Sequence, residues 1–131
     1  MAKPFHLSFV VPDLEAATSF YISVLGCGIG RDAGAWVDIL LFGHQLTIHQ
    51  EQDNLVAVAI DHFGPVLSKS EWLALSERVT SHQVNFQVPP QVKNEGAEGE
   101  TGKFILSDPA GNNLEFKYYK NFKGTVGEAD V

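Results

Sequence analysis

One carboxylate and two histidines carry the clearest chemical signal in this sequence. Glu115 lies in a β-rich run directly after a tight turn at residues 108–113, and His6 and His62 each lie in a β-rich run of their own. A carboxylate and two imidazoles brought together from three separate strands can bind a divalent transition metal on one face, which leaves its other positions free for substrate. These three residues are therefore candidate metal ligands.

The elements expected around these residues follow the same order twice, a strand, a helix and further strands. The first set is a strand at 5–11, a helix at about 13–25, and strands near 35–42 and 45–50. Asp13 is the expected N-cap of the first helix and Gly26 its stop. The second set is a strand at 56–67, a capping box at 68–71 opening a helix that ends near residue 82, and strands at 84–88, 103–107 and 114–119.

The two halves can be aligned with each other. In this alignment His6 and His62 occupy equivalent positions on the first strand of each module, and Glu115 is equivalent to Thr47. Four inward positions are therefore expected, of which three hold good metal ligands. We expect a single domain over residues 1–131, with module 1 at about 4–52, module 2 at about 56–120 and a polar, frayed tail at 121–131.

Residues 89–102 are expected to form a mobile surface segment or a lid. They contain two prolines, three glycines and three glutamates. Such a composition is typical of a loop and disfavours a buried element.

Composition excludes several classes of partner. The chain has 131 residues, 44% of them hydrophobic, with a formal net charge of -7. The sequence pI is about 5.0, which provides no basic field for nucleic acid or anionic lipid. No signal-like segment or bilayer-length apolar run is found, so we expect a cytoplasmic protein with a small-molecule substrate. Cys27 is the only cysteine, which excludes an internal disulfide and a Cys-x-x-Cys motif.

The repeated βαβββ pattern, with a histidine opening each module, resembles the vicinal oxygen chelate superfamily. This superfamily groups glyoxalase I, extradiol dioxygenases, fosfomycin-resistance transferases and bleomycin-resistance proteins, and the resemblance covers about residues 4–120. It is most similar to the small, predicted-dioxygenase branch. The motifs that carry it are Pro4-Phe5-His6-Leu7, Phe42-Gly43-His44-Gln45-Leu46, His62-Phe63-Gly64 and Asp108-Pro109-Ala110-Gly111-Asn112.

The resemblance implies an α+β fold in which two βαβββ modules form a curved mixed sheet around a metal site. It places His6, His62 and Glu115 at the liganding positions. It also implies a homodimer, in which the metal site is completed either within one chain or across the subunit interface. Two imidazoles and one carboxylate are typical of non-haem Fe(II), our first choice, with Mn(II), Zn(II) and Ni(II) as alternatives.

Four further residues are candidates for the pocket. Proteins resembling glyoxalase I carry a second glutamate where this chain has Thr47, so a four-ligand site is disfavoured. His49 shares the strand face of Thr47 and is the candidate acid/base, because imidazole transfers protons near neutral pH. Gln45, on the same face, is a candidate for a weak ligand or a hydrogen-bonding residue, and Tyr119 shares the phase of Glu115. Gln45, Thr47 and Tyr119 are therefore the candidate substrate-binding residues.

Three functional classes follow from the resemblance. Dioxygenase-like chemistry on a small substrate that chelates the metal through vicinal oxygens is the first, although residues 103–107 lack the tyrosine of ring-cleaving enzymes. Isomerase or lyase chemistry on an α-hydroxycarbonyl is the second, and a non-catalytic small-molecule binder of the resistance type is the third. A fosfomycin-type transferase would need a cationic cluster, and we interpret Arg31 and Lys117 as solvated surface charges.

Overall fold

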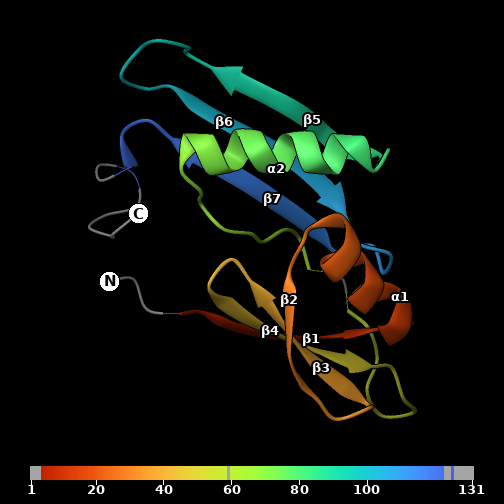
Figure 1. Cartoon of the computed structure of the whole chain (residues 1–131). Coiled ribbons are helices and arrows are strands. Elements are labelled where there is room, and N and C mark those ends of the chain that lie inside the picture. Colours follow the sequence, from red (N-terminus) through yellow and green to blue (C-terminus); the bar gives the residue numbers. More distant parts are fainter. Residues whose placement is uncertain (1–3, 59, 123–124, 126–131) are drawn as a thin grey trace. The chain divides into compact units, whose positions relative to one another are not determined.

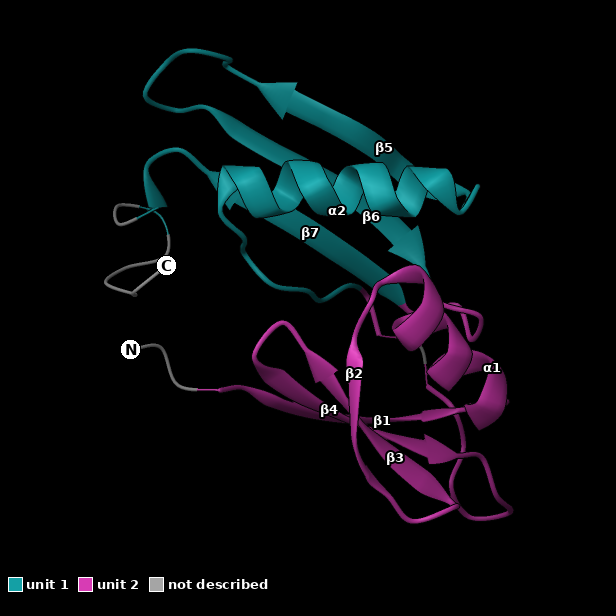
Figure 2. Ribbon diagram, in the orientation of Figure 1, with its two compact units in different colours: residues 1–2, 62–107, 113–131 teal, residues 3–61, 108–112 magenta. Residues whose placement is uncertain are grey.

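The chain forms two compact units, each built on one sheet. The computed structural model describes residues 4–58, 60–122 and 125. Unit 1 contains residues 62–107 and the described residues from 113 onward, and unit 2 contains the described residues up to 61 together with 108–112 (Figure 2). Sheets and few helices occur in both units, so the predicted α+β class is confirmed.

The sheet of unit 2 has the strand order β1-β4-β3-β2, with β1 parallel to β4 and the other pairs antiparallel (Figure 1). The strands are β1 His6–Val11, β2 Gly28–Asp32, β3 Trp36–Leu41 and β4 His44–Gln50. Alternate residues of a strand point to opposite faces, and one face of this sheet is apolar. Its buried side chains are Phe9, Val11, Val37, Ile39, Leu41, Leu46 and Ile48.

A helical segment contributes the other side of this core. It consists of α1, Leu14–Ser19, followed by a π-helical turn, η1, Phe20–Val24. The Asp13 side chain accepts a hydrogen bond from the Ala16 N–H at 3.0 Å. Gly26, at φ 76°, follows Leu25, the C-cap residue of η1. Both expected ends of the helix are therefore confirmed.

Unit 1 has a longer helix over a three-stranded sheet of order β5-β6-β7. Its elements are α2 Lys69–Ser81, β5 Phe86–Lys93, β6 Thr101–Ser107 and β7 Asn113–Tyr119. The predicted capping box is present, since Ser68 and Glu71 exchange side-chain to backbone hydrogen bonds. Trp72 is 2% exposed and donates its indole N–H to the Phe116 carbonyl at 2.9 Å, which fixes α2 on the sheet.

The segment opening unit 1 repeats the position of β1. Single bridges pair Phe63 with Leu114 and Val66 with Lys117, both parallel to β7. The predicted strand at 56–67 is wrong in extent, because among the described residues of this range, which leave out residue 59, regular pairing is limited to these bridges, and Pro65 has no N–H to donate. The topology nevertheless matches that of β1 beside β4, so the internal repeat seen in the sequence is also present in the sheet pairing.

The structure differs from the sequence prediction in two other places. β2 was not predicted, since its sequence Gly-Ile-Gly-Arg-Asp is exposed throughout and lacks the alternation of a half-buried strand. The predicted loop at 89–102 is shorter, because β5 continues through Pro89 and Pro90 to Lys93. β5 is an edge strand with irregular register between Val88 and Gln91, where proline is tolerated because no N–H is needed.

The turn before β7 is built around a buried carboxylate. Asp108 is 4% exposed and accepts hydrogen bonds from the N–H groups of Ala110 and Asn112 and from the Tyr21 hydroxyl at 3.1 Å. Gly111 has φ 88°, a conformation that favours glycine. The Asp-Pro-Ala-Gly-Asn motif therefore makes a fixed turn, and the carboxylate that follows it in β7 is Glu115.

Candidate functional site

A polar face of the unit 2 sheet is centred on Asp38. Ser8, Thr47 and Asp38 lie opposite one another across β1, β4 and β3, on the face away from the apolar core. Asp38 is only 1% exposed, and it accepts hydrogen bonds from the Thr47 hydroxyl at 2.8 Å and from Arg31 Nε at 2.5 Å. The Arg31 hydrogen bond, supported by that of Thr47, holds the pKa of Asp38 below its ordinary value although burial opposes this.

His6 is connected to this carboxylate through Gln45. The Nδ1 atom of His6 lies 2.8 Å from Gln45 Oε1, and Gln45 Nε2 lies 3.5 Å from Asp38 Oδ2. His6 itself is exposed. Three of the residues predicted from sequence, His6, Gln45 and Thr47, are thus brought together on one face.

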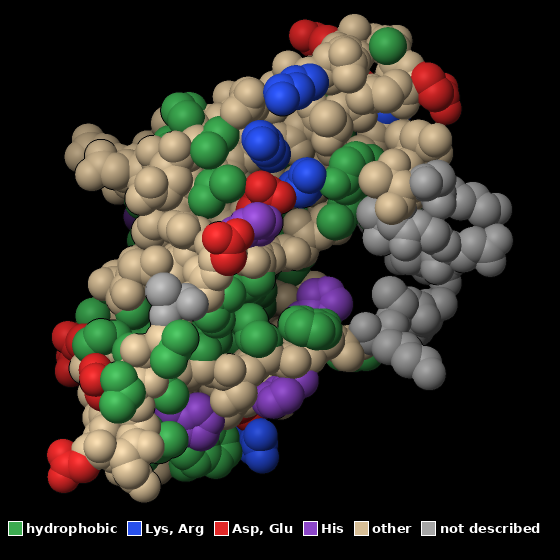
Figure 3. All heavy atoms as spheres, turned by 180° about the vertical axis from the view of Figure 1, so that it is seen from behind, with side chains coloured by type: hydrophobic (Ala, Val, Ile, Leu, Met, Phe, Trp, Pro, Cys, Tyr) green, Lys and Arg blue, Asp and Glu red, His purple; other side chains and the backbone are tan. Residues whose placement is uncertain are grey.

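An aromatic and cationic group adjoins this network. The His49 ring lies 6.3 Å from the Trp36 ring, and the Arg31 guanidinium lies 4.9 Å from the centre of the Trp36 ring. His49 shares the strand phase of Thr47, as expected. Arg31 is not the purely solvated charge expected from sequence, because it pairs with a buried carboxylate. Histidine side chains are visible at the surface among hydrophobic ones in unit 2 (Figure 3).

Unit 1 contributes the other two candidate ligands. The register that pairs Phe63 with Leu114 places His62 and Glu115 on the same face, opposite the core. The Nζ atom of Lys117 lies 3.7 Å from Glu115 Oε1 and 5.0 Å from the centre of the Tyr119 ring. The contact with Tyr119, and then the charge of Glu115, raise the pKa of Lys117. Lys117 is therefore a fixed cation beside Glu115, not a fully solvated one.

The predicted metal triad divides between the units. His62 and Glu115 belong to unit 1 and His6 to unit 2. Within residues 4–58, 60–122 and 125, no three His, Cys, Asp or Glu side chains form a ready metal-binding group. The donor types, two imidazoles and one carboxylate, fit Fe(II), Mn(II) or Zn(II). Their assembly stays a prediction.

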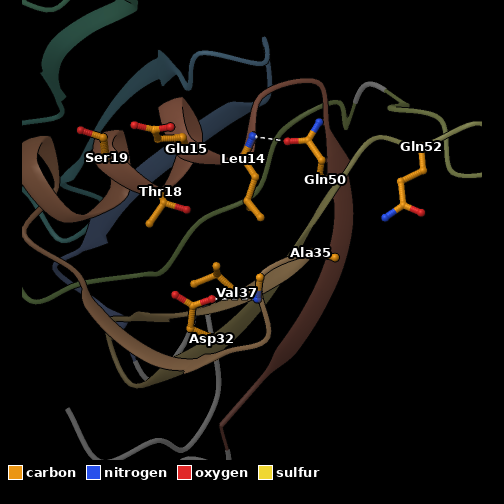
Figure 4. Close-up of a pocket in the computed structure, with 10 residues that line it drawn as sticks. Leu14, Glu15, Thr18, Ser19, Asp32, Ala35, Val37, Gln50 and Gln52 are labelled. Atoms are coloured by element: carbon orange, nitrogen blue, oxygen red, sulfur yellow. Dashed lines mark hydrogen bonds between the residues drawn. The ribbon is translucent and has the colours of Figure 1, made fainter.

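A separate cavity of about 620 Å³ opens on the other face of the unit 2 sheet (Figure 4). It lies beside α1, and residues lining it include Leu14, Thr18, Asp32, Val37 and Gln50. Gln50 closes one side by accepting a hydrogen bond from the Leu14 N–H at 2.9 Å. None of the predicted site residues lines this cavity.

Sequence reasoning missed Asp38 and the role of Arg31. The signal available was a single acidic residue within the apolar run of β3, in phase with Trp36 and with the polar positions of β4. The pairing of β3 with β4, which brings Asp38 beside Thr47, is a tertiary feature that the local sequence did not reveal.

The family follows from a comparison with protein-family models. Residues 3–116 match the model of the glyoxalase/bleomycin resistance protein/dioxygenase superfamily. The chain belongs to this superfamily. The resemblance inferred from the sequence, and the repeated fold expected with it, are therefore confirmed.

Solved structures of several proteins have the same fold. A glyoxalase/bleomycin resistance protein/dioxygenase from Alicyclobacillus acidocaldarius is 31% identical with a TM-score of 0.79, covering 94% of this chain and 96% of that one. An integron cassette protein from the mobile metagenome of the Halifax Harbour sewage outfall is 25% identical, with a TM-score of 0.68 and coverages of 90% and 99%. A lactoylglutathione lyase from Agrobacterium tumefaciens is 20% identical, with a TM-score of 0.68 and coverages of 92% and 96%.

A search of curated proteins found no match. Among the described residues, no helix has the length and apolar character that crossing a membrane requires.

Proposed function

We propose that this protein is a metal-dependent enzyme with His6, His62 and Glu115 as the metal ligands. The observation that carries the proposal is the register of unit 1, which places His62 and Glu115 on one sheet face. His6 is the first residue of β1, and His62 is the first residue of the equivalent segment in unit 1. Because the two positions are equivalent in the repeat, we propose that His6 is also a metal ligand. Fe(II) is the favoured ion, with Mn(II), Zn(II) and Ni(II) as alternatives.

The substrate class is a small molecule with two adjacent oxygens. When bound, the ion supplies Lewis acidity toward such a pair of oxygens. His49 is proposed as the acid/base, because its exposed fraction is intermediate and it lies two residues from Thr47 on the same face. Gln45, Thr47 and Tyr119 are proposed to border the substrate. We favour dioxygenase-like chemistry.

Thr47 supports a three-ligand site over a four-ligand one. Its hydroxyl donates to Asp38 and its side chain is buried, so it offers no carboxylate at the position equivalent to Glu115. The isomerase or lyase class would need to act without that second carboxylate.

Metal analysis of a Glu115→Gln variant tests the proposal. We expect the parent protein, purified without chelator, to carry about one divalent ion per chain. The variant should bind this ion at least about 100-fold more weakly, because loss of a metal ligand costs more affinity than loss of a residue that only hydrogen-bonds to a ligand, which costs about 10 to 100-fold. Glu98→Gln, which neutralises an exposed carboxylate of the same unit, is the matched control. A metal-free parent, or equal metal affinity in Glu115→Gln, would contradict the proposal and favour a non-catalytic binder.

Oxygen dependence then separates the reaction classes. Consumption of O2 with a panel of catechols and other vicinal-oxygen compounds is expected for the dioxygenase class. Metal-dependent turnover of an α-hydroxycarbonyl under anaerobic conditions would instead assign the isomerase or lyase class.

We also propose that the protein is a homodimer. Nine large hydrophobic side chains are exposed among the described residues, and seven of them belong to unit 2. They are Phe5, Ile29, Leu40, Phe42, Leu55, Val56 and Val58. An excess of exposed apolar side chains on one unit favours a surface that a second copy covers.

A further inference from the structure

The buried carboxylate of Asp38 is unusual because the fold does not require it. Asp38 pairs with Thr47 across β3 and β4, whereas Ile105 pairs with Glu115 at the equivalent place in unit 1. The same module therefore accepts an apolar residue at this position. Burying a charge costs free energy unless it is paired and hydrogen-bonded, so a buried Asp38 calls for an explanation other than packing.

The hydrogen-bond donors around Asp38 keep its carboxylate ionised, and the carboxylate in turn fixes the orientation of the Gln45 amide. Arg31 and Thr47 both donate to the carboxylate, and the first of these bonds holds its pKa down. An ionised carboxylate can only accept hydrogen bonds. The group that Gln45 turns toward Asp38 must therefore be its amide NH2, at 3.5 Å from Oδ2.

The orientation of the Gln45 amide determines the tautomer of His6. With its NH2 toward Asp38, Gln45 presents its carbonyl oxygen to His6 Nδ1 at 2.8 Å. A carbonyl oxygen can only accept, so Nδ1 of His6 must carry the hydrogen. In a neutral imidazole the lone pair then remains on Nε2.

We propose that Asp38 is a positioning residue that acts through Gln45 to hold His6 as the Nδ1–H tautomer, with Nε2 presented as the metal-binding atom. The metal-binding part of this inference rests on the proposed function. The tautomer part concerns only residues of unit 2. Partners of this kind raise metal affinity because they fix both the tautomer and the orientation of a histidine ring.

The tautomer of His6 can be measured directly in the metal-free full-length protein. With ¹⁵N-labelled histidine at about pH 8, where imidazoles are ordinarily neutral, we expect NMR of the parent to show the hydrogen of His6 on Nδ1. In Asp38→Leu, an apolar residue like the one at the equivalent place in unit 1, no acceptor remains for the Gln45 NH2, so Gln45 is free to reverse and a mixture of His6 tautomers is expected. Asp53→Asn, at an exposed turn, should leave the His6 signals unchanged.

A double variant provides a rescue that a merely structural role would not give. In Asp38→Leu/Gln45→Glu a carboxylate accepts directly from His6, so the Nδ1–H tautomer should return although Asp38 is absent. Mn(II) titration of the same proteins is expected to show affinity about 10 to 100-fold lower in Asp38→Leu, and partly restored in the double variant.

The outcomes separate this inference from the function on which it rests. An Nε2–H tautomer in the parent, or an unchanged His6 tautomer in a folded Asp38→Leu variant, would overturn the role of Asp38 and leave the metal proposal standing. The expected tautomer change without any loss of Mn(II) affinity would retain the Asp38 to His6 connection and overturn His6 as a ligand.

Discussion

Gly64 packs directly against the backbone of Glu115, a candidate metal ligand. A Cβ atom at this position would lie 1.9 Å from the Glu115 carbonyl oxygen and 2.8 Å from its carbonyl carbon. Both of these atoms are backbone and cannot swing aside as a side-chain tip can. The absence of a side chain therefore allows the segment after His62 to approach β7 next to the candidate carboxylate ligand.

We predict that Gly64→Ala separates this segment from β7. The clash should lower the free energy of unfolding by about 1 to 3 kcal/mol, the usual cost of forcing extra atoms into a packed place, and should weaken metal binding. Urea unfolding and metal titration measure the two effects. Gly99→Ala is the control, since the nearest contact of its added Cβ would be an ordinary 3.8 Å. Equal stability of the two variants would contradict the prediction.

At the scale of elements, the connection between β5 and β6 is held by a buried carboxylate. Glu100 is 5% exposed and accepts from the Gly96 N–H at 2.8 Å and from the Tyr118 hydroxyl at 3.0 Å, and it pairs with Lys69 of α2 at 3.0 Å. The Gly96 bond first, then Lys69 and Tyr118, lower the pKa of Glu100 to about 2. The segment expected to be a mobile lid is therefore anchored at its end.

This anchor predicts a dependence of stability on pH. A carboxylate whose pKa falls on folding, here from an ordinary 4.5 to about 2, stabilises fully above about pH 4.5. That contribution is lost as the pH falls from about 4.5 toward 2. Glu100→Gln should unfold at a lower temperature than the parent at pH 7, and the difference should shrink over that acid range.

Thermal unfolding followed by circular dichroism across pH 2 to 7 measures the difference in unfolding temperature between the parent and Glu100→Gln. The size of this difference should reflect the size of the pKa change on folding. Glu98→Gln removes an exposed carboxylate from the same connection and should follow the parent at every pH. A constant difference between parent and Glu100→Gln through the acid range would count against the assignment.

At the scale of the whole molecule, the candidate ligands are distributed over both units. His6 and the Asp38 network belong to unit 2, while His62 and Glu115 belong to unit 1. A homodimer could complete the site from one chain or from two, and both arrangements agree with the repeat. The exposed apolar side chains of unit 2 favour association with a second copy.

We predict that sedimentation equilibrium gives twice the chain mass of 14.3 kDa. Mixing and refolding His6→Ala with His62→Ala then identifies the pairing. If sites form across subunits, mixed dimers regain one intact metal site, whereas sites within a chain stay defective. His82→Ala, at the exposed end of α2, is the control for losing a histidine. A monomer mass at micromolar concentration would contradict the homodimer.

The sequence by itself determined what depends on local pattern. Alternating apolar residues, the Asp13 N-cap, the capping box at Ser68 and the Asp108 turn are local features, because their partners lie within a few residues. Periodicity also revealed the repeat, and with it the equivalence of His6 and His62. For the same reason the extent of β5 was missed, since proline disfavours a strand locally and only its place at a sheet edge permits it.

Tertiary structure alone decided which residues surround these candidates. Asp38 meets Arg31, Thr47 and Gln45 because β3 pairs with its neighbours in one particular register, and a shift of one residue would turn it to the apolar face. Such contacts cannot be predicted from the spacing of these residues in the sequence, because the register of the strands is set by the packing of the whole sheet. Local sequence therefore predicted the candidate ligands, whereas Asp38, the carboxylate proposed to orient His6, could be identified only from the pairing of the strands.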